Sequence, residues 1–389
     1  MAAMRADKAS GRPAAGLDSL SIEGDRISAL LRLGTTEHEL AFRAPGVPLE
    51  PRYEPFLVAA LPIAMSAGSS LSVPEPVSPR LLDRLGTVQE IFTAWVEGMQ
   101  PIEVEAEAGV HDAAGGRGTA SFFSRGVDSF YTVLRNLDEI DSLVYTFGFD
   151  VSPDNRRARA PMSRAIGEIA AELQRPVVEV ETNLREVSDL YCRWGMYHGA
   201  FLASVGLVLA PTFRRMLVPA TYSYASLISR GSHALLDPMW STEAVEFVHE
   251  GAATRTAKVE ELSRSELAMR TLRVCWNEEA EQNCGQCEKC LRTMAALRIA
   301  GTLERCATMP DELPLRALSR VRMRNEVVQT TLKELLMEAD ARRTDRALAW
   351  VLRYMVTRGV LYQALWRSGS PSVTRLRGAI GAADRRLRR

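Results

Sequence analysis

Four cysteines in the second half of the chain have the residue type and the spacing of a metal site. They form a C-x8-C-x2-C-x2-C array and are Cys275, Cys284, Cys287 and Cys290. Thiolates at such short range repel one another unless a cation lies among them, and four sulfurs suit tetrahedral Zn²⁺. An iron–sulfur cluster is the alternative, because four cysteines also hold that group. A site with four protein ligands is closed, so we expect a structural metal that ties the last strand to the helix after Cys290.

A second group of residues has the arrangement of a phosphate-binding loop. The apolar run Ala120–Phe123 leads into a short polar segment and then directly into a helical pattern. The residues of this segment are Ser124, Arg125, Gly126, Val127, Asp128 and Ser129. A strand, a tight turn with a glycine and a helix N-terminus bring several backbone N–H groups and the positive end of a helix dipole to one point. The segment therefore predicts a site for an anionic phosphate group, with two serine hydroxyls as further donors.

This hexapeptide resembles the S-G-G-x-D-S signature of the PP-loop ATP pyrophosphatases. The resemblance implies that ATP binds on the loop, that pyrophosphate is released and that the substrate is adenylylated, with Asp128 and Ser129 as the catalytic side chains. It also implies that Asp128 helps to hold the Mg²⁺ that accompanies the triphosphate. Arg125 stands where the family usually has its first glycine. Either a positive φ strains the arginine there, or its guanidinium binds the phosphates.

The next predicted strand ends at Thr146–Asp150. In the PP-loop family the main chain at this strand end reads the adenine, so the resemblance assigns nucleotide contacts to Phe147 and Gly148. A strand terminus with a glycine turn is the alternative interpretation. Arg156 and Arg157 follow, either as triphosphate contacts or as an exposed helix start.

The cysteine array extends the resemblance. With Val-Cys-Trp at 274–276 and Cys-Gly-Gln-Cys-Glu-Lys-Cys-Leu-Arg at 284–292, it is similar to the zinc-binding end of the 7-cyano-7-deazaguanine synthase family of the queuosine pathway. The resemblance covers about residues 118–301. It implies that a carboxylate is adenylylated and that ammonia then gives an amide, which a second activation takes to a nitrile. The family's V-P-x-R-N segment reads Val-Pro-Ala-Thr-Tyr here, at 218–222, so its Arg-Asn pair is missing.

The leading prediction is a ligase-type enzyme that uses ATP, a small carboxylate and ammonia or an amine, with a protein acceptor left open. A PP-loop sulfurtransferase acting on a nucleoside is one alternative, for which Cys192 and Cys306 are the available thiols. A non-catalytic, zinc-stabilised nucleotide-binding module is the other. His233 and Asp237 are candidates for substrate contacts at the ends of the strands, where open α/β sheets bind ligands, or else for structural hydrogen bonds.

These sites need an α/β domain to position them. Short apolar runs alternate with helical patterns from Gly118 to about Cys290, which is typical of a Rossmann-like parallel sheet, and the resemblance specifies the adenine nucleotide alpha-hydrolase type. We expect the strands at Ala120–Phe123, Leu143–Phe149, Val177–Val180, Met216–Pro219 and Leu272–Trp276. The helices between them include Val127–Leu137 and Pro161–Leu173.

The regions on either side of this domain have patterns of their own. We expect a disordered lead-in at 1–17, an N-terminal α+β extension at 18–117, the ATP-binding domain with its zinc site at 118–301 and a helical C-terminal region at 302–389. The extension is predicted from period-two apolar positions and one amphipathic helix. Its elements are the strands Asp18–Ile22, Arg26–Leu33 and Glu37–Phe42 and the helix Ser78–Met99.

Composition limits the partners of the chain. Lys plus Arg and Asp plus Glu both number 48 in 389 residues, so no net field steers the chain toward nucleic acid or a membrane surface. The apolar runs Phe56–Val73 and Ala200–Pro211 are broken or too short to cross a bilayer and predict buried core. Residues 1–17 lack the apolar region of a secretory peptide, so we expect the protein in the cytoplasm. A homodimer is left open.

Overall fold

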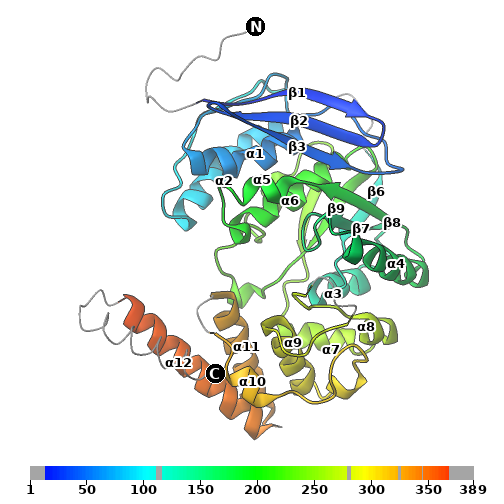
Figure 1. Ribbon diagram of the computed structural model, residues 1–389, viewed down its shortest axis with the longest axis vertical. Helices are drawn as coiled ribbons and strands as arrows, with labels where there is room; N and C mark the ends of the chain where they lie inside the picture. The colour runs from blue at the N-terminus through cyan, green and yellow to red at the C-terminus, as the bar shows by residue number, and fades with distance from the viewer. Residues whose placement is uncertain (1–13, 111–115, 278–281, 323–325, 344, 368–389) are drawn as a thin grey trace.

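The computed structural model describes residues 14–110, 116–277, 282–322, 326–343 and 345–367. Residues 1–13 of the predicted lead-in and residues 368–389 of the predicted C-terminal region lie outside this part of the chain. Within it, ten strands form one mostly parallel sheet in the order β10-β9-β6-β7-β8-β3-β2-β1-β4-β5. Figure 1 shows the N-terminal strands at one end of the molecule and the C-terminal helices at the other.

The parallel half of the sheet positions the candidate site. Its strands are β6 (Gly118–Phe122), β7 (Ser142–Phe147), β8 (Val177–Thr182), β9 (Phe213–Pro219) and β10 (Glu246–Glu250). The chain runs outward from β6 through β7 to β8, then crosses back to β9 on the other side of β6. A doubly wound sheet has its crevice where the direction of winding changes, which here is between the carboxyl ends of β6 and β9. The prediction of an α/β fold with a parallel sheet is confirmed, and the strand order is compatible with a Rossmann-like fold.

Helices connect these strands and cover the sheet. They are α3 (Val127–Arg135), α4 (Arg156–Leu173), α5 (Leu184–Ser188) and α6 (Trp194–Val208). The helix predicted from Pro161 begins earlier, at Arg156, because the Asn155 side chain caps it by accepting a hydrogen bond from the Ala158 N–H. Pro161 is therefore inside the helix.

The N-terminal region continues the same sheet. The strands β1 (Ala15–Glu23), β2 (Arg26–Leu33) and β3 (Thr36–Arg43) are antiparallel neighbours, and β3 pairs with β8 through Phe42 opposite Thr182. The first strand starts at Ala15, inside the range predicted as lead-in. The remaining elements here are α1 (Glu54–Ala67), β4 (Leu71–Ser72), α2 (Pro79–Trp95) and β5 (Val104–Glu105).

Two helices that are apolar on all sides hold this region to the parallel sheet. α1 is buried from Glu54 to Met65 and packs against α6, which is buried over most of its length. Both belong to one hydrophobic core that also includes residues of β2, β3 and β9. The prediction that these two apolar runs form buried core is confirmed. Among the described residues, no helix combines the length and the apolar character needed to cross a membrane.

The described residues after β10 form helices joined by loops, and these include the described part of the C-terminal region that is predicted to be helical. The helices are α7 (Arg255–Leu262), α8 (Glu266–Thr271), α9 (Glu288–Ile299), α10 (Leu315–Ser319), α11 (Glu326–Arg342) and α12 (Arg346–Arg367). Three single 3-10 turns lie at Tyr224–Ser226, Asp237–Trp240 and Leu303–Arg305. α11 packs against α7, α9 and α12, and a second hydrophobic core joins these helices to α3 and α4. The lower, C-terminal helices of Figure 1 lie below the sheet and reach it through α3 and α4, which contact α7 and α8.

One predicted strand, Leu272–Trp276, is wrong. The segment follows the end of α8 and pairs with no strand; its backbone N–H groups are taken by other partners. The Arg273 N–H donates to the Arg125 carbonyl, and those of Val274 and Cys275 donate to the side chain of Asn283. The strand that pairs with β9 at this edge of the sheet is instead β10, in which only two of the five residues are apolar.

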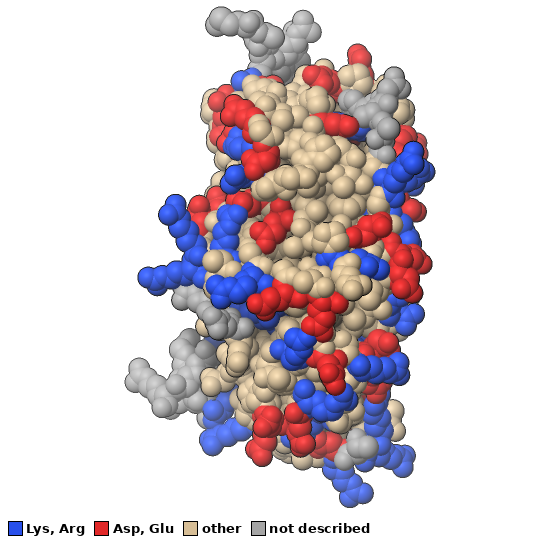
Figure 2. Space-filling model, turned by 90° about the vertical axis from the view of Figure 1, so that its right-hand side faces the viewer, with Lys and Arg blue, Asp and Glu red and all other residues tan. Residues whose placement is uncertain are grey.

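The surface carries both signs of charge. Figure 2 shows basic and acidic side chains interspersed over the middle and lower parts of one face, with a broad area of other residues above them. This agrees with the equal numbers of basic and acidic residues in the chain. No single-sign field dominates the face shown.

Candidate functional site

A cavity of about 420 Å³ lies at the carboxyl ends of the central strands. It is lined from β6 by the predicted phosphate loop, from β7 by the last residues of the strand, and from β9 by the segment Pro219–Tyr222. This is the place where winding of the sheet reverses, so the cavity is where an α/β sheet of this topology binds ligands. The loop residues that line it are Ser124, Gly126, Val127, Asp128 and Ser129.

The loop is held by its own serines. The Ser124 N–H donates to Ser129 Oγ over 3.1 Å, and Ser129 Oγ donates to the Gly126 carbonyl over 3.1 Å. Gly126 is the N-cap of α3 and has no side chain to accept from the first N–H groups of the helix. Those N–H groups and the positive end of the helix dipole therefore suit an anion beside the loop.

Arg125 lies in the loop but its side chain leaves the cavity. Its φ is +63°, the left-handed region that favours glycine. The guanidinium donates to the Thr271 carbonyl through Nη2 at 3.0 Å and Nε at 3.3 Å. Burial, with Arg273 nearby, lowers the pKa of Arg125 to about 10, so it stays protonated at neutral pH. The positive φ is thus present, and the guanidinium, bound to the Thr271 carbonyl, lies outside the cavity lining, which gives no support to the expected phosphate contact.

Replacing Arg125 by glycine should therefore change stability more than ligand affinity. The variant loses a charge-assisted contact with a carbonyl, which stabilises by about 1.5–3 kcal/mol. Relief of the left-handed backbone returns about 1–2 kcal/mol. We expect a net loss of about 1 kcal/mol in the free energy of unfolding, measured in urea, and a nucleotide affinity within about threefold of the native protein. Nucleotide binding that is tenfold weaker in the glycine variant would contradict this prediction and would indicate that Arg125 contacts the phosphates.

Asp128 is paired with two cations that the sequence analysis did not identify. Its Oδ1 accepts from Lys258 Nζ at 2.7 Å and its Oδ2 from Arg255 Nη2 at 3.3 Å. Burial by itself raises the pKa of Asp128, but Arg255 and Lys258 outweigh it, so the pKa is lowered from its usual value. Both carboxylate oxygens are thus occupied by protein cations, which gives no support to the prediction that Asp128 holds Mg²⁺.

Lys258 is wholly enclosed. Its side chain has no exposed surface, and its ammonium also donates to the Ala220 carbonyl at the end of β9. Burial lowers the pKa of Lys258, and Asp128 opposes that shift. A signal for the pair was present in the sequence. Arg255 and Lys258 fall in the first turns of a helix, where the dipole disfavours cations, so an anionic partner was to be expected.

Further arginines surround the hydroxyl end of Tyr222 in the same cavity. Burial raises the pKa of Tyr222 to about 12, and Arg230, Arg292 and Arg255 act in the opposite direction. Arg292 is itself buried; it is ion-paired with Glu288 and donates from Nη1 to Thr331 Oγ1 at 2.8 Å. Several arginines thus line the same cavity as the phosphate loop.

The predicted adenine contacts are not in the cavity lining. Phe147 is fully buried with its ring 4.8 Å from the Arg159 guanidinium carbon. Gly148 has φ +102°, and a Cβ there would lie 2.1 Å from the Thr182 carbonyl oxygen, so the glycine is required for close packing of β7 and β8. Strand packing therefore explains why a glycine stands at this position, without a bound nucleotide.

Residues next to these two do line the cavity. The hydroxyls of Tyr145 and Thr146 are buried and have no hydrogen-bond partner among the described residues. Phe149 and Asp150 line the same wall. Buried hydroxyls without a partner are costly, but these two oxygen atoms have almost no accessible surface and so do not open onto the cavity.

The far wall of the cavity comes from α5 and α6. Trp194 and His198 lie there, with the Arg185 guanidinium carbon 4.6 Å from the centre of the Trp194 ring. Burial and the charge of Arg230 lower the pKa of His198 to about 4, so this imidazole is neutral at physiological pH. Its Nδ1 lies 3.1 Å from the Gly195 carbonyl, which can only accept, so Nδ1 carries the proton.

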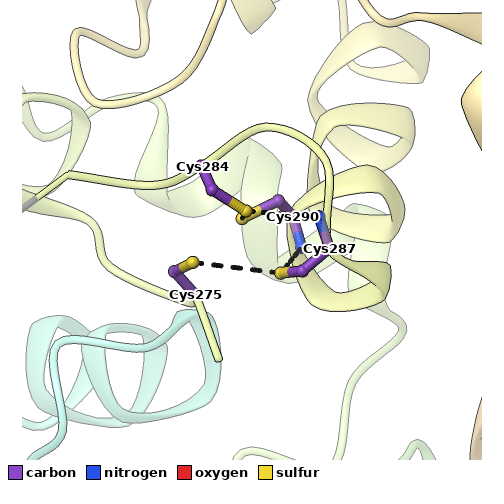
Figure 3. A group of neighbouring side chains, drawn as sticks. All are labelled: Cys275, Cys284, Cys287 and Cys290. Carbon is purple, nitrogen blue, oxygen red and sulfur yellow. Dashed lines mark hydrogen bonds between the residues drawn. The ribbon is translucent and has the colours of Figure 1, made fainter. Parts of the chain in front are cut away.

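The four predicted metal ligands come together beside the cavity. Figure 3 shows their sulfurs pointing toward one another, with Cys287 and Cys290 at the start of α9 and Cys275 and Cys284 on the loops facing it. Their Sγ atoms all lie within 4.8 Å of one another; Cys275 and Cys287 are 4.0 Å apart and Cys284 and Cys290 3.9 Å. Zinc–sulfur bonds of about 2.3 Å give a tetrahedron with edges of about 3.8 Å. The four cysteines could therefore hold a metal such as zinc.

Asn283 fixes the geometry of this cluster and was missed from the sequence. Its Oδ1 accepts from the Val274 and Cys275 N–H groups, and its Nδ2 donates to the Leu272 carbonyl and to Thr308 Oγ1. The residue thus ties the segment with the first ligand to the loop with the second. Because Cys275 also lines the cavity, the cluster holds one wall of the candidate site in place.

Several other candidates have structural partners instead. Asp237 accepts from Ser232 Oγ at 2.8 Å and lies 2.7 Å from His249 Nδ1, and its neighbour His233 accepts from a backbone N–H. Cys192 and Cys306 are both buried, and burial raises the pKa of each thiol, for Cys192 to about 11. The Arg156 and Arg157 side chains are exposed at the start of α4, outside the cavity lining.

Comparison of the chain with protein-family models, with curated proteins and with solved structures gave no match. The arguments for function therefore come from the cavity and the cysteine cluster themselves.

Proposed function

We propose that the protein is an ATP-dependent ligase-type enzyme of the PP-loop kind, which adenylylates a carboxylate and releases pyrophosphate. One observation carries the proposal. The loop Ser124–Ser129 and the N-terminus of α3 line a cavity whose walls also bear Arg230, Arg255 and Arg292. An anion with several charges, such as a triphosphate, suits a cavity lined by both backbone N–H groups and guanidinium groups.

In this proposal Asp128 acts by holding cations. It places Arg255 and Lys258 next to the loop, and Arg255, which lines the cavity, is the one that can contact a phosphate oxygen. The Ser124 hydroxyl can donate to a phosphate from the loop, while Ser129, whose hydroxyl donates to the Gly126 carbonyl, holds the loop in shape. Together these groups offset the negative charge that builds up as the bond to pyrophosphate breaks, and Mg²⁺ arrives with the nucleotide.

The nucleoside of ATP, the carboxylate and the amine are assigned to the other walls of the cavity. The nucleoside end of ATP is assigned to the end of β7, where Tyr145 and Thr146 line the cavity. The wall of Trp194, His198 and Arg230 takes the substrate carboxylate and then ammonia or an amine. Attack by the carboxylate on the α-phosphorus gives an acyl-adenylate, and attack by nitrogen on the acyl carbon releases AMP. The cysteine cluster, filled by zinc, has a structural role in holding Cys275 and the cavity wall.

A screen of small carboxylates with ATP, Mg²⁺ and ammonium tests this proposal. The expected result is formation of AMP and pyrophosphate in equal amounts with at least one carboxylate, measured by chromatography and by a coupled pyrophosphate assay. Release of ADP and phosphate would contradict the proposed bond cleavage. Saturable ATP binding without AMP under any condition would favour the non-catalytic nucleotide-binding module.

Replacing Cys192 by serine separates the ligase from a sulfurtransferase. Its thiol donates to the Pro62 carbonyl and lies 3.3 Å from Ser66 Oγ, within the core and not in the cavity lining. With a pKa of about 11 it is un-ionised at neutral pH and is a poor nucleophile. We expect the variant to form AMP at a rate within about twofold of the native protein. Loss of turnover in a folded variant would favour sulfur transfer.

A further inference from the structure

The C-terminal helix α11 forms part of the candidate nucleotide site. It belongs to the region beyond residue 301, which the family resemblance does not cover. Yet Val327 and Val328 line the cavity, and α11 packs directly on α7 and α9. The helix therefore contributes one wall of the cavity, and its polar residues reach the segments that carry the cavity's cations.

Glu334 of α11 joins two of those segments. One carboxylate oxygen, Oε1, accepts from Ser223 Oγ at 3.0 Å, in the loop that follows β9. The other, Oε2, accepts from the Arg255 N–H at 3.0 Å, at the start of α7. One turn earlier on the same helix, Thr331 Oγ1 accepts from Arg292. The same face of α11 thus contacts residues next to, or belonging to, the arginines of the cavity.

The Glu334 carboxylate is well placed to hold the backbone of Arg255. The Arg255 N–H is the first of α7, so a negative charge there interacts with the positive end of the helix dipole. The backbone of Arg255 is held by Glu334 while its guanidinium reaches Asp128 at 3.3 Å. A shift of the α7 N-terminus would move the guanidinium relative to the phosphate loop.

We propose that Glu334 is a positioning residue that sets Arg255 against the nucleotide phosphates, so that the C-terminal helical region is a working part of the ATP site. The inference rests on the proposed function. Because coupling between two equilibria is reciprocal, nucleotide binding should in turn stabilise the docking of α11. The C-terminal region then has a role that its sequence pattern alone does not suggest.

Titration of ATP with Mg²⁺ into the full-length protein and its variants tests the inference. Glu334→Ala should weaken binding about tenfold, as expected for loss of the contacts that orient a charge-assisted phosphate donor. Glu334→Gln keeps one acceptor oxygen and should bind with an intermediate affinity. Glu338→Ala is the matched control: it lies one turn further along α11, pairs with Arg342 and should bind as the native protein does. Zinc content and circular dichroism check that each variant is folded.

A double variant distinguishes positioning from general loosening of the fold. If Glu334 acts through Arg255, Glu334→Ala combined with Arg255→Ala should bind no more weakly than Arg255→Ala alone. The inference would be overturned if the losses of ATP affinity in the two single variants multiplied in the double variant. Native ATP affinity in a folded Glu334→Ala or Glu334→Gln variant would also overturn it. Absence of ATP binding by the native protein is a different result, because it removes the proposed function, and with it the basis for assigning a role to Glu334.

Discussion

Replacing Asp128 by asparagine should abolish AMP formation and also lower the stability of the protein. Lys258 has no exposed surface, and Asp128 is the carboxylate that neutralises it. Breaking a buried ion pair by removing one partner costs about 3–5 kcal/mol, and we expect the lower end because asparagine still accepts a hydrogen bond. Arg255 loses its partner in the same variant. Urea unfolding and chromatographic detection of AMP measure the two effects.

A second substitution separates stability from turnover. Lys258→Met in the Asp128→Asn background removes the uncompensated buried charge and should restore much of the lost stability. It cannot restore the placement of Arg255, so AMP formation should stay absent. An Asp128→Asn protein that forms AMP at the native rate would show that this carboxylate has no part in the reaction. Unchanged stability would show that the Asp128–Lys258 contact is not important for the fold.

Loss of the metal site should have the second large effect. We expect about one zinc per chain, and none after Cys287→Ser, because Cys287 is both a ligand and the N-cap of α9. Binding energy in structural zinc sites is folding energy, about 10–16 kcal/mol in small zinc-finger peptides, so the variant should lose the packing of α9 or fail to accumulate. Chelation of the native protein should lower its melting temperature.

A cysteine outside the cluster serves as a control for the zinc prediction. Cys306 is buried near the cluster but lies outside it, with its Sγ 3.6 Å from Thr308 Oγ1. Cys306→Ser should keep the full zinc content, measured by elemental analysis of the purified protein. Iron with visible absorption in the native protein would support the iron–sulfur alternative, and a native protein without any metal would contradict the assignment of the cluster.

The sequence predicts local features of this protein well because they depend on neighbouring residues. The four cysteines, the loop before α3 and the apolar runs that become α1 and α6 each have a signal within a few residues. The sheet register and the strand order depend on contacts between residues that are far apart in the sequence. The N-terminal strands could be expected as a hairpin, but their continuation of the parallel sheet depends on two pairs, Phe42–Thr182 and Arg43–Glu181, which no periodicity reveals.

The missed residues around the phosphate loop act across long sequence separations, whereas Asn283 binds backbone groups that are nearby in the sequence. Lys258 and Arg255 reach Asp128 from another helix, and Glu334 reaches Arg255 from a third. The strand predicted at Leu272–Trp276 does not form because Asn283 and the Arg125 carbonyl take its backbone N–H groups. An extended apolar run predicts an extended backbone, but it does not say whether another strand or a side chain will satisfy that backbone.

The central claim is that the cavity beside Ser124–Ser129 binds the triphosphate of ATP. Isothermal titration of the zinc-loaded native protein with ATP and Mg²⁺, set against the Asp128→Asn, Lys258→Met double variant, tests it most directly. The account predicts saturable binding of one ATP per native chain and at least a tenfold weaker affinity in the folded double variant. Equal affinity in the two proteins, or no saturable binding by the native chain at millimolar ATP, would contradict it.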